Sequence, residues 1–200
     1  MDMELNLNGL KLSVTERVYP PSDDTYLLMD AVKDIAKGLV LDVGAGTGAV
    51  ALTAASKGCF TVAVDIDRNA ARCTKLNITA NKLRGLADVL VGDLVSAFKD
   101  RSFDLIVFNP PYLPVEEKGL GRAWSGGRSG RAVSDRFISE APLKLKDEGL
   151  ILLVQSSLSG IEEAVERFRR QGLEATVKER KRIGWFEELA LVKASSKKKP

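Results

Sequence analysis

A four-residue stretch, Asn109-Pro110-Pro111-Tyr112, directly follows an apolar run from Phe103 to Phe108. A planar NH2 group has two protons and a delocalised lone pair, so it attacks an electrophilic carbon only when acceptors take the protons and orient the nitrogen. The Asn109 side-chain carbonyl can accept one proton and the Pro110 backbone carbonyl the other, because two prolines fix the chain direction. Tyr112 offers a flat face to the planar group. The stretch therefore predicts chemistry on a planar amino group, with Asn109, Pro110 and Tyr112 as catalytic residues.

Simpler roles are also open for these residues. An asparagine before prolines is common in turns, and a tyrosine after a buried strand can be a half-buried packing ring.

The composition limits the available chemistry. The 200 residues include no histidine, which removes the commonest general base and metal ligand. Cys59 and Cys73 are the only cysteines, and two isolated thiols are typical of small buried hydrophobes rather than of a disulfide or metal pair. We therefore expect no metal site, and chemistry that uses carboxylates, amides, backbone groups or a bound cofactor.

Length and charge predict one globular domain over residues 1–194 followed by a basic disordered tail at 195–200. No apolar run approaches the length of a membrane span, and Met1 to Leu12 lacks the layout of a signal peptide, so a cytoplasmic protein is expected. The net charge is +3, but residues 193–200 hold four lysines and no acids, so the remainder has a net charge of −1. A duplex-binding domain would be expected to carry positive charge on its folded part.

Apolar runs alternate with amphipathic helical patterns from residue 22 onward. Helices are expected at 23–37, 47–57, 68–81, 131–146 and 161–170, and strands at 39–43, 60–64, 87–91, 103–108, 150–155, about 173–182 and about 185–193. Ser22 is expected to cap the first helix, and Pro142 to kink the fourth or start a new turn. Repeated strand–helix units predict an α/β fold with a doubly wound parallel sheet. The last two strands have no helix between them, so one should be antiparallel.

A glycine-rich stretch from Asp42 to Gly48, D-V-G-A-G-T-G, joins the first of these strands to its helix. Gly44, Gly46 and Gly48 allow a tight turn and close approach of a ligand to the backbone. The spacing is not the G-x-G-x-x-G of dinucleotide sites, and the Asp42 carboxylate would repel a phosphate. A cationic ligand suits this position, and the sulfonium and amino groups of S-adenosylmethionine fit.

Polar residues also follow the next two strands. Asp65 could accept both hydroxyls of a ribose, and Asp93 could accept from the adenine amine while Leu94 offers its backbone amide and an apolar surface. Taken singly, the glycine stretch could be a tight connection and each aspartate a helix N-cap. Ligands of open α/β sheets bind at the carboxyl ends of strands, so the convergence of these acids with Asn109 favours a nucleoside cofactor site.

From about residue 15 to 193 the chain resembles the class I S-adenosylmethionine-dependent methyltransferases. Within them it looks like the HemK-like branch, which methylates the glutamine side-chain amide of class 1 translation release factors and carries N-P-P-Y. Two further stretches resemble signatures of the archaeal and eukaryotic subgroup. Val18 to Thr25 matches V-Y-x-P-x-x-D-T, and Trp124 to Arg131 matches W-x-G-G-x-x-G-R. Asp23 and Asp42 stand where members often have Glu, and both keep the carboxylate.

The resemblance implies a seven-stranded Rossmann-like sheet of order 3-2-1-4-5-7-6 with strand 7 antiparallel. It also implies S-adenosylmethionine as cofactor, S-adenosylhomocysteine as product, and cofactor-binding roles for Tyr19, Thr25, Asp42, Gly44, Gly46, Gly48, Asp65, Asp93, Leu94 and Asn109. In that scheme Tyr19 and Thr25 lie beside the methionine moiety, and Asn109 also contacts the substrate amide.

The function expected from this resemblance is methyl transfer to the glutamine of the Gly-Gly-Gln motif of a class 1 release factor. The alternatives are N-methylation of adenine or guanine in RNA or DNA, or of a protein lysine, because N-P-P-Y alone does not distinguish these amino groups. A non-catalytic nucleotide-binding protein is a further alternative, against which the intact N-P-P-Y argues.

The resemblance also implies a partner, a small zinc-binding activator protein. We expect it to add a strand at the edge formed by the third strand of the sheet, Ala87 to Val91, which is apolar and otherwise open. The alternative is an edge covered by the chain itself. Arginines 122, 128, 131 and 136 surround Trp124 and could form a substrate-binding lid or a solvated loop and helix face.

Overall fold

The computed structural model describes residues 3–113 and 126–196. The chain divides into two compact units, Met1–Ala97 and Phe98–Pro200. The first contains β1 (Met3–Leu7), β2 (Leu10–Val14), α1 (Asp23–Ile35), β3 (Leu39–Val43), α2 (Ala49–Ser56), β4 (Phe60–Asp65), α3 (Arg68–Ala80) and β5 (Ala87–Val91). The second contains β6 (Phe103–Phe108), α4 (Ala132–Glu140), a 3-10 turn (Ala141–Lys144), β7 (Leu145–Ser156), α5 (Ile161–Arg170), β8 (Leu173–Ile183) and β9 (Glu187–Ser196). No helix among the described residues is long and apolar enough to span a membrane.

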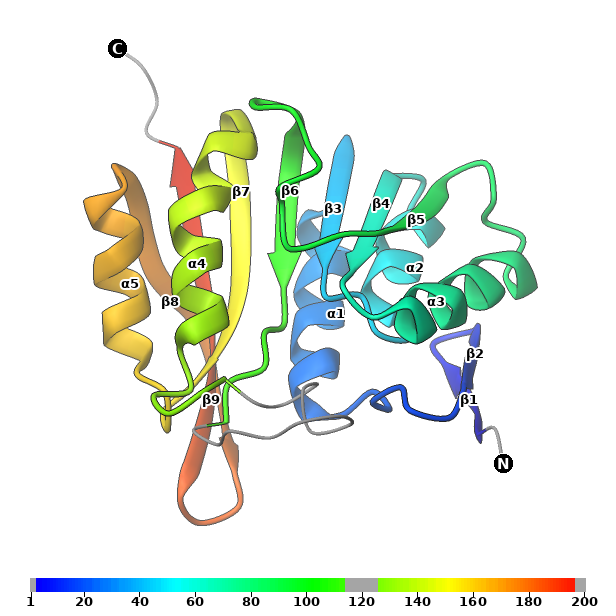
Figure 1. The fold of residues 1–200 in the computed structure, drawn as a ribbon, viewed down its shortest axis with the longest axis horizontal. Coiled ribbons are helices and arrows are strands. Elements are labelled where there is room, and N and C mark those ends of the chain that lie inside the picture. Colours follow the sequence, from blue (N-terminus) through cyan, green and yellow to red (C-terminus); the bar gives the residue numbers. More distant parts are fainter. Residues whose placement is uncertain (1–2, 114–125, 197–200) are drawn as a thin grey trace. The chain divides into compact units, whose positions relative to one another are not determined.

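Seven strands form a sheet in the order β5-β4-β3-β6-β7-β9-β8 (Figure 1). β4 runs parallel to β3 and to β5, and β7 runs parallel to β6. β9 is antiparallel to both β7 and β8. Counted from β3, this order confirms the predicted fold class, in which the last strand lies between the fifth and the sixth and runs against its neighbours.

An N-terminal hairpin, β1 and β2, was not predicted from the sequence. Asn8 and Gly9 connect its strands, with φ of 54° and 86°. Two successive positive φ angles are typical of the two-residue hairpin turn that Asn-Gly favours, so the sequence did contain the signal. Alternate residues of β2 are buried, as expected for a strand with one face on a core.

The second unit differs from the prediction around Pro142. The helix expected at 131–146 is α4, which ends at Glu140 and continues as the 3-10 turn Ala141–Lys144. Proline lacks the N–H that an α-helix would need at this point, so the chain leaves the helix early. β7 then begins at Leu145, five residues before the predicted start, and pairs with both β6 and β9.

The predicted start of the tail was also wrong. β9 includes Ser195 and Ser196, whose registered partners on β8 are Glu174 and Leu173. Residues 197–200 lie outside the described part of the chain. The single domain at 1–194 stays a prediction.

Candidate active site

The glycine-rich turn lies in the first unit, between β3 and α2. The N–H groups of Gly44 and Ala45 both donate to the Val64 carbonyl of β4, at 2.8 and 3.2 Å, so the turn folds back over the neighbouring strand. Gly44 and Gly46 have φ of 64° and 57°, a region that L side chains rarely adopt. A Cβ at Gly46 would meet no atom within 4 Å, so its backbone conformation, rather than crowding, requires glycine there.

Gly48 has a different structural role. It precedes α2 with φ of 81°, and a Cβ built on it would lie 2.8 Å from Cγ2 of Thr74 and 3.0 Å from Cδ1 of Leu52. Gly48 therefore lets α2 begin in contact with α3. A contact between Gly48 and a cofactor stays a prediction.

Asp65 joins the glycine turn to the turn that follows β4. Its Oδ2 accepts from the Gly46 N–H at 2.9 Å, and its Oδ1 accepts from the Asp67 N–H at 2.8 Å. Asp67, not Asp65, caps α3, because its side chain accepts from the Asn69 N–H. Burial raises the pKa of Asp65, an effect that these N–H donors oppose. A carboxylate has about four acceptor positions, so Asp65 retains capacity for hydroxyl donors.

Asp42 is a buried carboxylate at the end of β3, 3% exposed. Its Oδ2 accepts from the Ala51 N–H at 2.9 Å, in the first turn of α2. Burial raises the pKa of Asp42 to about 7, the Ala51 N–H opposes this, and the negative charge of Asp65 adds to it. Near neutral pH, Asp42 is therefore partly protonated in the folded protein, and a bound cationic ligand would favour its ionised form.

Asp93 and Leu94 form the turn after β5. The Asp93 carbonyl accepts from both the backbone N–H and the hydroxyl of Ser96. Leu94 is buried and has a φ of 48°, which is unusual for a residue with a side chain. Strained backbone of this kind is often retained at binding sites, which agrees with the expected role of this turn.

Tyr19 and Thr25 flank the start of α1. The Tyr19 hydroxyl lies 3.1 Å from the Ser22 hydroxyl, which donates to Oδ1 of Asp24 at 2.7 Å. The same carboxylate oxygen accepts from the N–H and the hydroxyl of Thr25. Ser22 thus precedes the helix as predicted, but its side chain does not cap it. Asp24, the aspartate of the matched V-Y-x-P-x-x-D-T stretch, thus organises this segment through its Oδ1.

Asn77, on α3, is a residue that sequence reasoning missed. It is fully buried, and its Nδ2 donates to the Thr47 carbonyl of the glycine turn and to the Ser13 carbonyl of β2, both at 2.9 Å. Its Oδ1 accepts from the Ser13 N–H at 2.8 Å. Thr74 adds a bond from its hydroxyl to the Gly46 carbonyl at 3.0 Å. The signal was a polar residue at a helical spacing from Ala70 and Cys73, on the buried face.

Asn109 lies in the second unit, directly after β6. Its Oδ1 is buried and has no hydrogen-bond partner among the described residues. An unpaired buried acceptor costs about 1–3 kcal/mol, so such atoms are few in a folded domain, and a bound ligand that donates to the oxygen is one explanation for it. Pro110 is buried, and Pro111 and Tyr112 are half-buried. Tyr112 therefore also fits its alternative role as a packing ring.

The second subgroup signature contacts Leu113, the residue that directly follows the N-P-P-Y stretch. The Gly126 N–H donates to the Leu113 carbonyl at 2.8 Å. A Cβ on Gly126 would lie 2.4 Å from the Gly130 carbonyl oxygen, and the Ala132 N–H donates to the Gly126 carbonyl at 3.0 Å. A side chain at position 126 would collide with the backbone of Gly130, so this tight turn requires glycine there. Trp124 and Arg122 lie outside the described residues.

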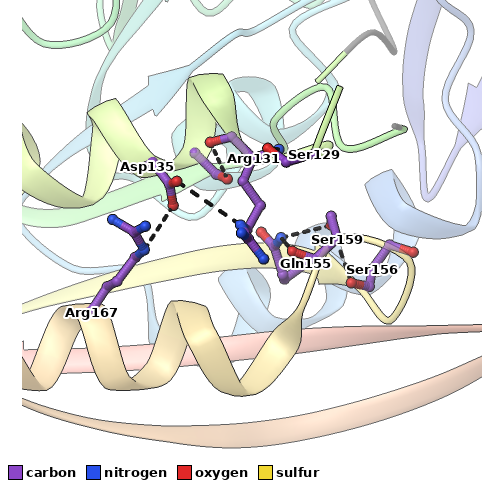
Figure 2. Close-up of polar contacts among 8 residues, drawn as sticks. Ser129, Arg131, Asp135, Gln155, Ser156, Ser159 and Arg167 are labelled. Carbon is purple, nitrogen blue, oxygen red and sulfur yellow. Dashed lines mark hydrogen bonds and ion pairs between the residues drawn. The ribbon is translucent and has the colours of Figure 1, made fainter. Parts of the chain in front are cut away.

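The described arginines of the predicted lid lie on and before α4. Asp135 faces one of them, Arg131, at 4.0 Å, and also Arg167 of α5 at 3.1 Å (Figure 2). Arg136 pairs with Glu140 one turn further along α4, at 3.7 Å. Ion pairs within the helical layer favour the alternative of a helix face for Arg131 and Arg136 over that of a substrate lid.

Comparisons with known proteins identify the family of this chain. Residues 22–182 match the family model described as the methyltransferase small domain. A "putative protein N5-glutamine methyltransferase" from Methanocaldococcus jannaschii is 35% identical over 96% of this chain and 98% of its own length. The mouse protein named "Methyltransferase HEMK2" is 38% identical over 80% of this chain and 81% of its own.

A solved structure shows the same fold. It is the "E. cuniculi Mtq2-Trm112 complex", described as responsible for methylation of the eRF1 translation termination factor. It superposes with a TM-score of 0.71 at 27% identity, covering 90% of this chain and 99% of that one. The fold and site thus define a class I methyltransferase. The chain belongs to the methyltransferase small-domain family, and the resemblance to its HemK-like members is confirmed.

Proposed function

We propose that this protein transfers the methyl group of S-adenosylmethionine to the side-chain amide nitrogen of the glutamine in the Gly-Gly-Gln motif of a class 1 translation release factor. The observation that carries the proposal is the buried Oδ1 of Asn109, which has no partner among the described residues. Asn109 directly follows β6 and is the first residue of the N-P-P-Y stretch. An amide NH2 group would supply the hydrogen-bond donor that this oxygen lacks. The HemK-like relatives support a protein glutamine as the source of that amide.

The residues of the first unit fit the proposed cofactor. Asp42 has a raised pKa that a cationic amino group would lower, and Asp65 retains acceptor capacity for ribose hydroxyls. The other residues of the first unit that would hold the group are Tyr19, Thr25, Gly44, Gly46, Gly48, Asp93 and Leu94. Asn109 of the second unit would also contact it, although its main role would be toward the acceptor amide. When bound, S-adenosylmethionine supplies an electrophilic methyl group.

The second unit would orient the acceptor amide. Asn109 Oδ1 and the Pro110 carbonyl would accept the two amide protons, and Tyr112 would face the amide plane. A carboxamide nitrogen is a weak nucleophile, so this orientation is the main contribution of the protein, and no strong base is required if the proton leaves late. We expect the enzyme to act in the cytoplasm, where its substrate meets the ribosome.

The test is a labelling assay. The protein is incubated with methyl-labelled S-adenosylmethionine and a class 1 release factor, and in parallel with the same factor carrying Gln→Ala in Gly-Gly-Gln. We expect label on the first and none on the second. Label that persists on the variant, or that goes only to RNA or to lysine, would refute the glutamine assignment.

We also propose a small activator protein bound at β5. β5 is an edge strand of the seven-stranded sheet and pairs with β4 on its inner side. Val91 is 50% exposed, and Leu76 of the adjacent α3 is 57% exposed, so apolar surface lies along the open edge. A strand of the activator would hydrogen-bond to the backbone of β5 at this edge, as in other cases of strand addition. The "Mtq2-Trm112" complex is a relative with such a second chain, and a bound zinc in the activator is part of the proposal.

Size-exclusion chromatography of the co-expressed pair tests this partner. Leu90→Asp should abolish co-elution, while Leu143→Asp, an exposed site in the second unit, should not. Wild-type protein that elutes alone would argue against the activator, and loss with both variants would argue against the β5 edge.

A further inference from the structure

The tip of the β8–β9 hairpin carries two adjacent exposed aromatic side chains. Trp185 is 85% exposed and Phe186 is 93% exposed. Ile183 pairs with Glu187, so only three residues form the turn, and Gly184 begins it with φ of 61°. A turn this short cannot fold back over its own rings. The other exposed large apolar side chains among the described residues are at most 67% exposed, so these two adjacent rings are the most exposed of them, and patches of this kind mark interaction sites.

The base of this hairpin is firmly held. Arg180 of β8 forms ion pairs with Glu188 of β9 and, at 2.8 Å, with Glu162 of α5. The Ser157 N–H donates to the Glu188 carbonyl at 2.8 Å, and the Ser156 hydroxyl donates to Glu187 at 2.7 Å. The two rings are therefore presented by a supported ribbon, which reduces the ordering cost of binding.

The hairpin extends past the strand end that carries Asn109, within the same unit. Phe108 of β6 is in register with Leu153 of β7, and Leu153 is in register with Val192 of β9. β9 begins at Glu187, so it continues about 16 Å beyond the level of Phe108 at about 3.3 Å per residue. Because β9 is antiparallel to β7, this extension lies at the carboxyl ends of β6 and β7 (Figure 1).

The charges around the rings are mixed. Residues 178–188 include four basic side chains and three acidic ones, and Arg182 is in register with Glu188. A surface for RNA or anionic lipid would be expected to be strongly basic. Aromatic anchors within a rim of both charges are typical of a protein–protein interface.

We propose that Trp185 and Phe186 dock the folded protein substrate, as a second contact beyond the glutamine that enters at Asn109. The inference rests on the proposed function, because it takes the partner to be the protein that carries this glutamine. A folded substrate can span the distance between the strand end and the hairpin tip. The contact is remote from the reacting atoms and equally present before and during methyl transfer, so it lowers KM and leaves kcat unchanged.

Steady-state kinetics with an intact class 1 release factor tests the proposal. The variants are W185A/F186A and, as a matched control, L143A, which truncates an apolar side chain that is 60% exposed near the start of β7. We expect the double variant to raise KM at least about tenfold with unchanged kcat, as for loss of an aromatic anchor pair. L143A should match the wild type. The ring-retaining variant W185Y/F186Y should recover most of the affinity, which separates docking from misfolding.

The outcomes separate a failure of the proposed function from a failure of the docking proposal. Wild-type protein that fails to label the release factor removes the proposed function and this inference with it. Wild-type labelling with an unaltered KM in the double variant removes the docking surface alone. Binding of tRNA, of phosphatidylserine vesicles or of a second copy of this chain that is lost in the double variant, without a change in KM, also overturns it.

Discussion

The replacement of Asn77 by alanine should strongly destabilise the protein. Asn77 of α3 and Asn81, which directly follows this helix, bond the backbone of β2 in the same way. Asn77 bonds the N–H and carbonyl of Ser13, and Asn81 bonds the N–H and carbonyl of Lys11, at 2.9 and 2.7 Å. The two side chains thus act as the neighbouring strand that β2 lacks on this side. Asn77 is fully buried and also bonds the Thr47 carbonyl, whereas the bonds between Asn81 and Lys11 are exposed.

The magnitude follows from burial. Asn77→Ala removes three hydrogen bonds to backbone groups, two of them part-buried and one fully buried, and leaves those groups without this partner. At about 1 kcal/mol for each bond, we expect a loss of roughly 3 kcal/mol or more in the free energy of unfolding. Asn81→Ala exposes its partners to water, which replaces the bonds, so its cost should be below about 1 kcal/mol.

Urea denaturation followed by circular dichroism measures both values. The two variants delete the same atoms, but Asn77 lies inside α3 and Asn81 follows its last residue. Alanine gains up to about 0.7 kcal/mol of helix propensity at the interior position, which lowers the expected difference between the variants without removing it. Equal losses for Asn77→Ala and Asn81→Ala would refute the reasoning, because burial would then not decide the cost.

Three further predictions concern the candidate site. Gly48→Ala should cost about 2–4 kcal/mol in the free energy of unfolding, from φ strain and the 2.8 Å contact with Thr74, whereas Gly46→Ala, which meets no atom, should cost about 1 kcal/mol; thermal unfolding of both tests this. Asn109→Ala should leave S-adenosylmethionine affinity by calorimetry nearly unchanged and reduce turnover at least about a hundredfold, and equal loss of both would indicate a structural asparagine. The folded-state pKa of Asp42 is raised from 3.8 to about 7, so the folded protein binds this proton more tightly than the unfolded chain, and the free energy of unfolding should fall as pH rises between these values. Asp42→Asn should remove that part of the slope, and cofactor binding to the wild type between pH 5.5 and 7 should release a proton that the variant does not release; identical pH profiles would exclude an ionisable Asp42.

The alternation of apolar and helical segments was sufficient to predict the sheet. β3, β5, β6 and α5 have the predicted bounds, because short buried strands and amphipathic helices bounded by glycine have strong local patterns. The N-terminal hairpin was missed although Asn8-Gly9 is a hairpin signal. The helix predicted to end at Lys146 ends at Glu140. The amphipathic pattern continues past Pro142, but proline cannot supply the N–H that the helix would need.

The residue types at the strand ends could likewise be read from the chain. Asp42 is the last residue but one of β3, Asp65 is the last residue of β4, and Asn109 directly follows β6, so all three lie at strand ends as predicted. Their hydrogen bonds could not be read in this way. Asp67 rather than Asp65 caps α3, and Gly48 is needed for helix packing, because both facts depend on neighbours distant in sequence.

The sequence by itself determined the class of the protein, since strand ends, glycine spacing and the N-P-P-Y stretch are local features with fixed consequences. The tertiary structure decided which polar atoms are satisfied. It brought Ser13, Thr47 and Asn77 together over large separations in sequence, and it left Asn109 Oδ1 buried without a partner among the described residues. Only burial and distance give a polar atom its energetic cost, and neither is a property of the residue type.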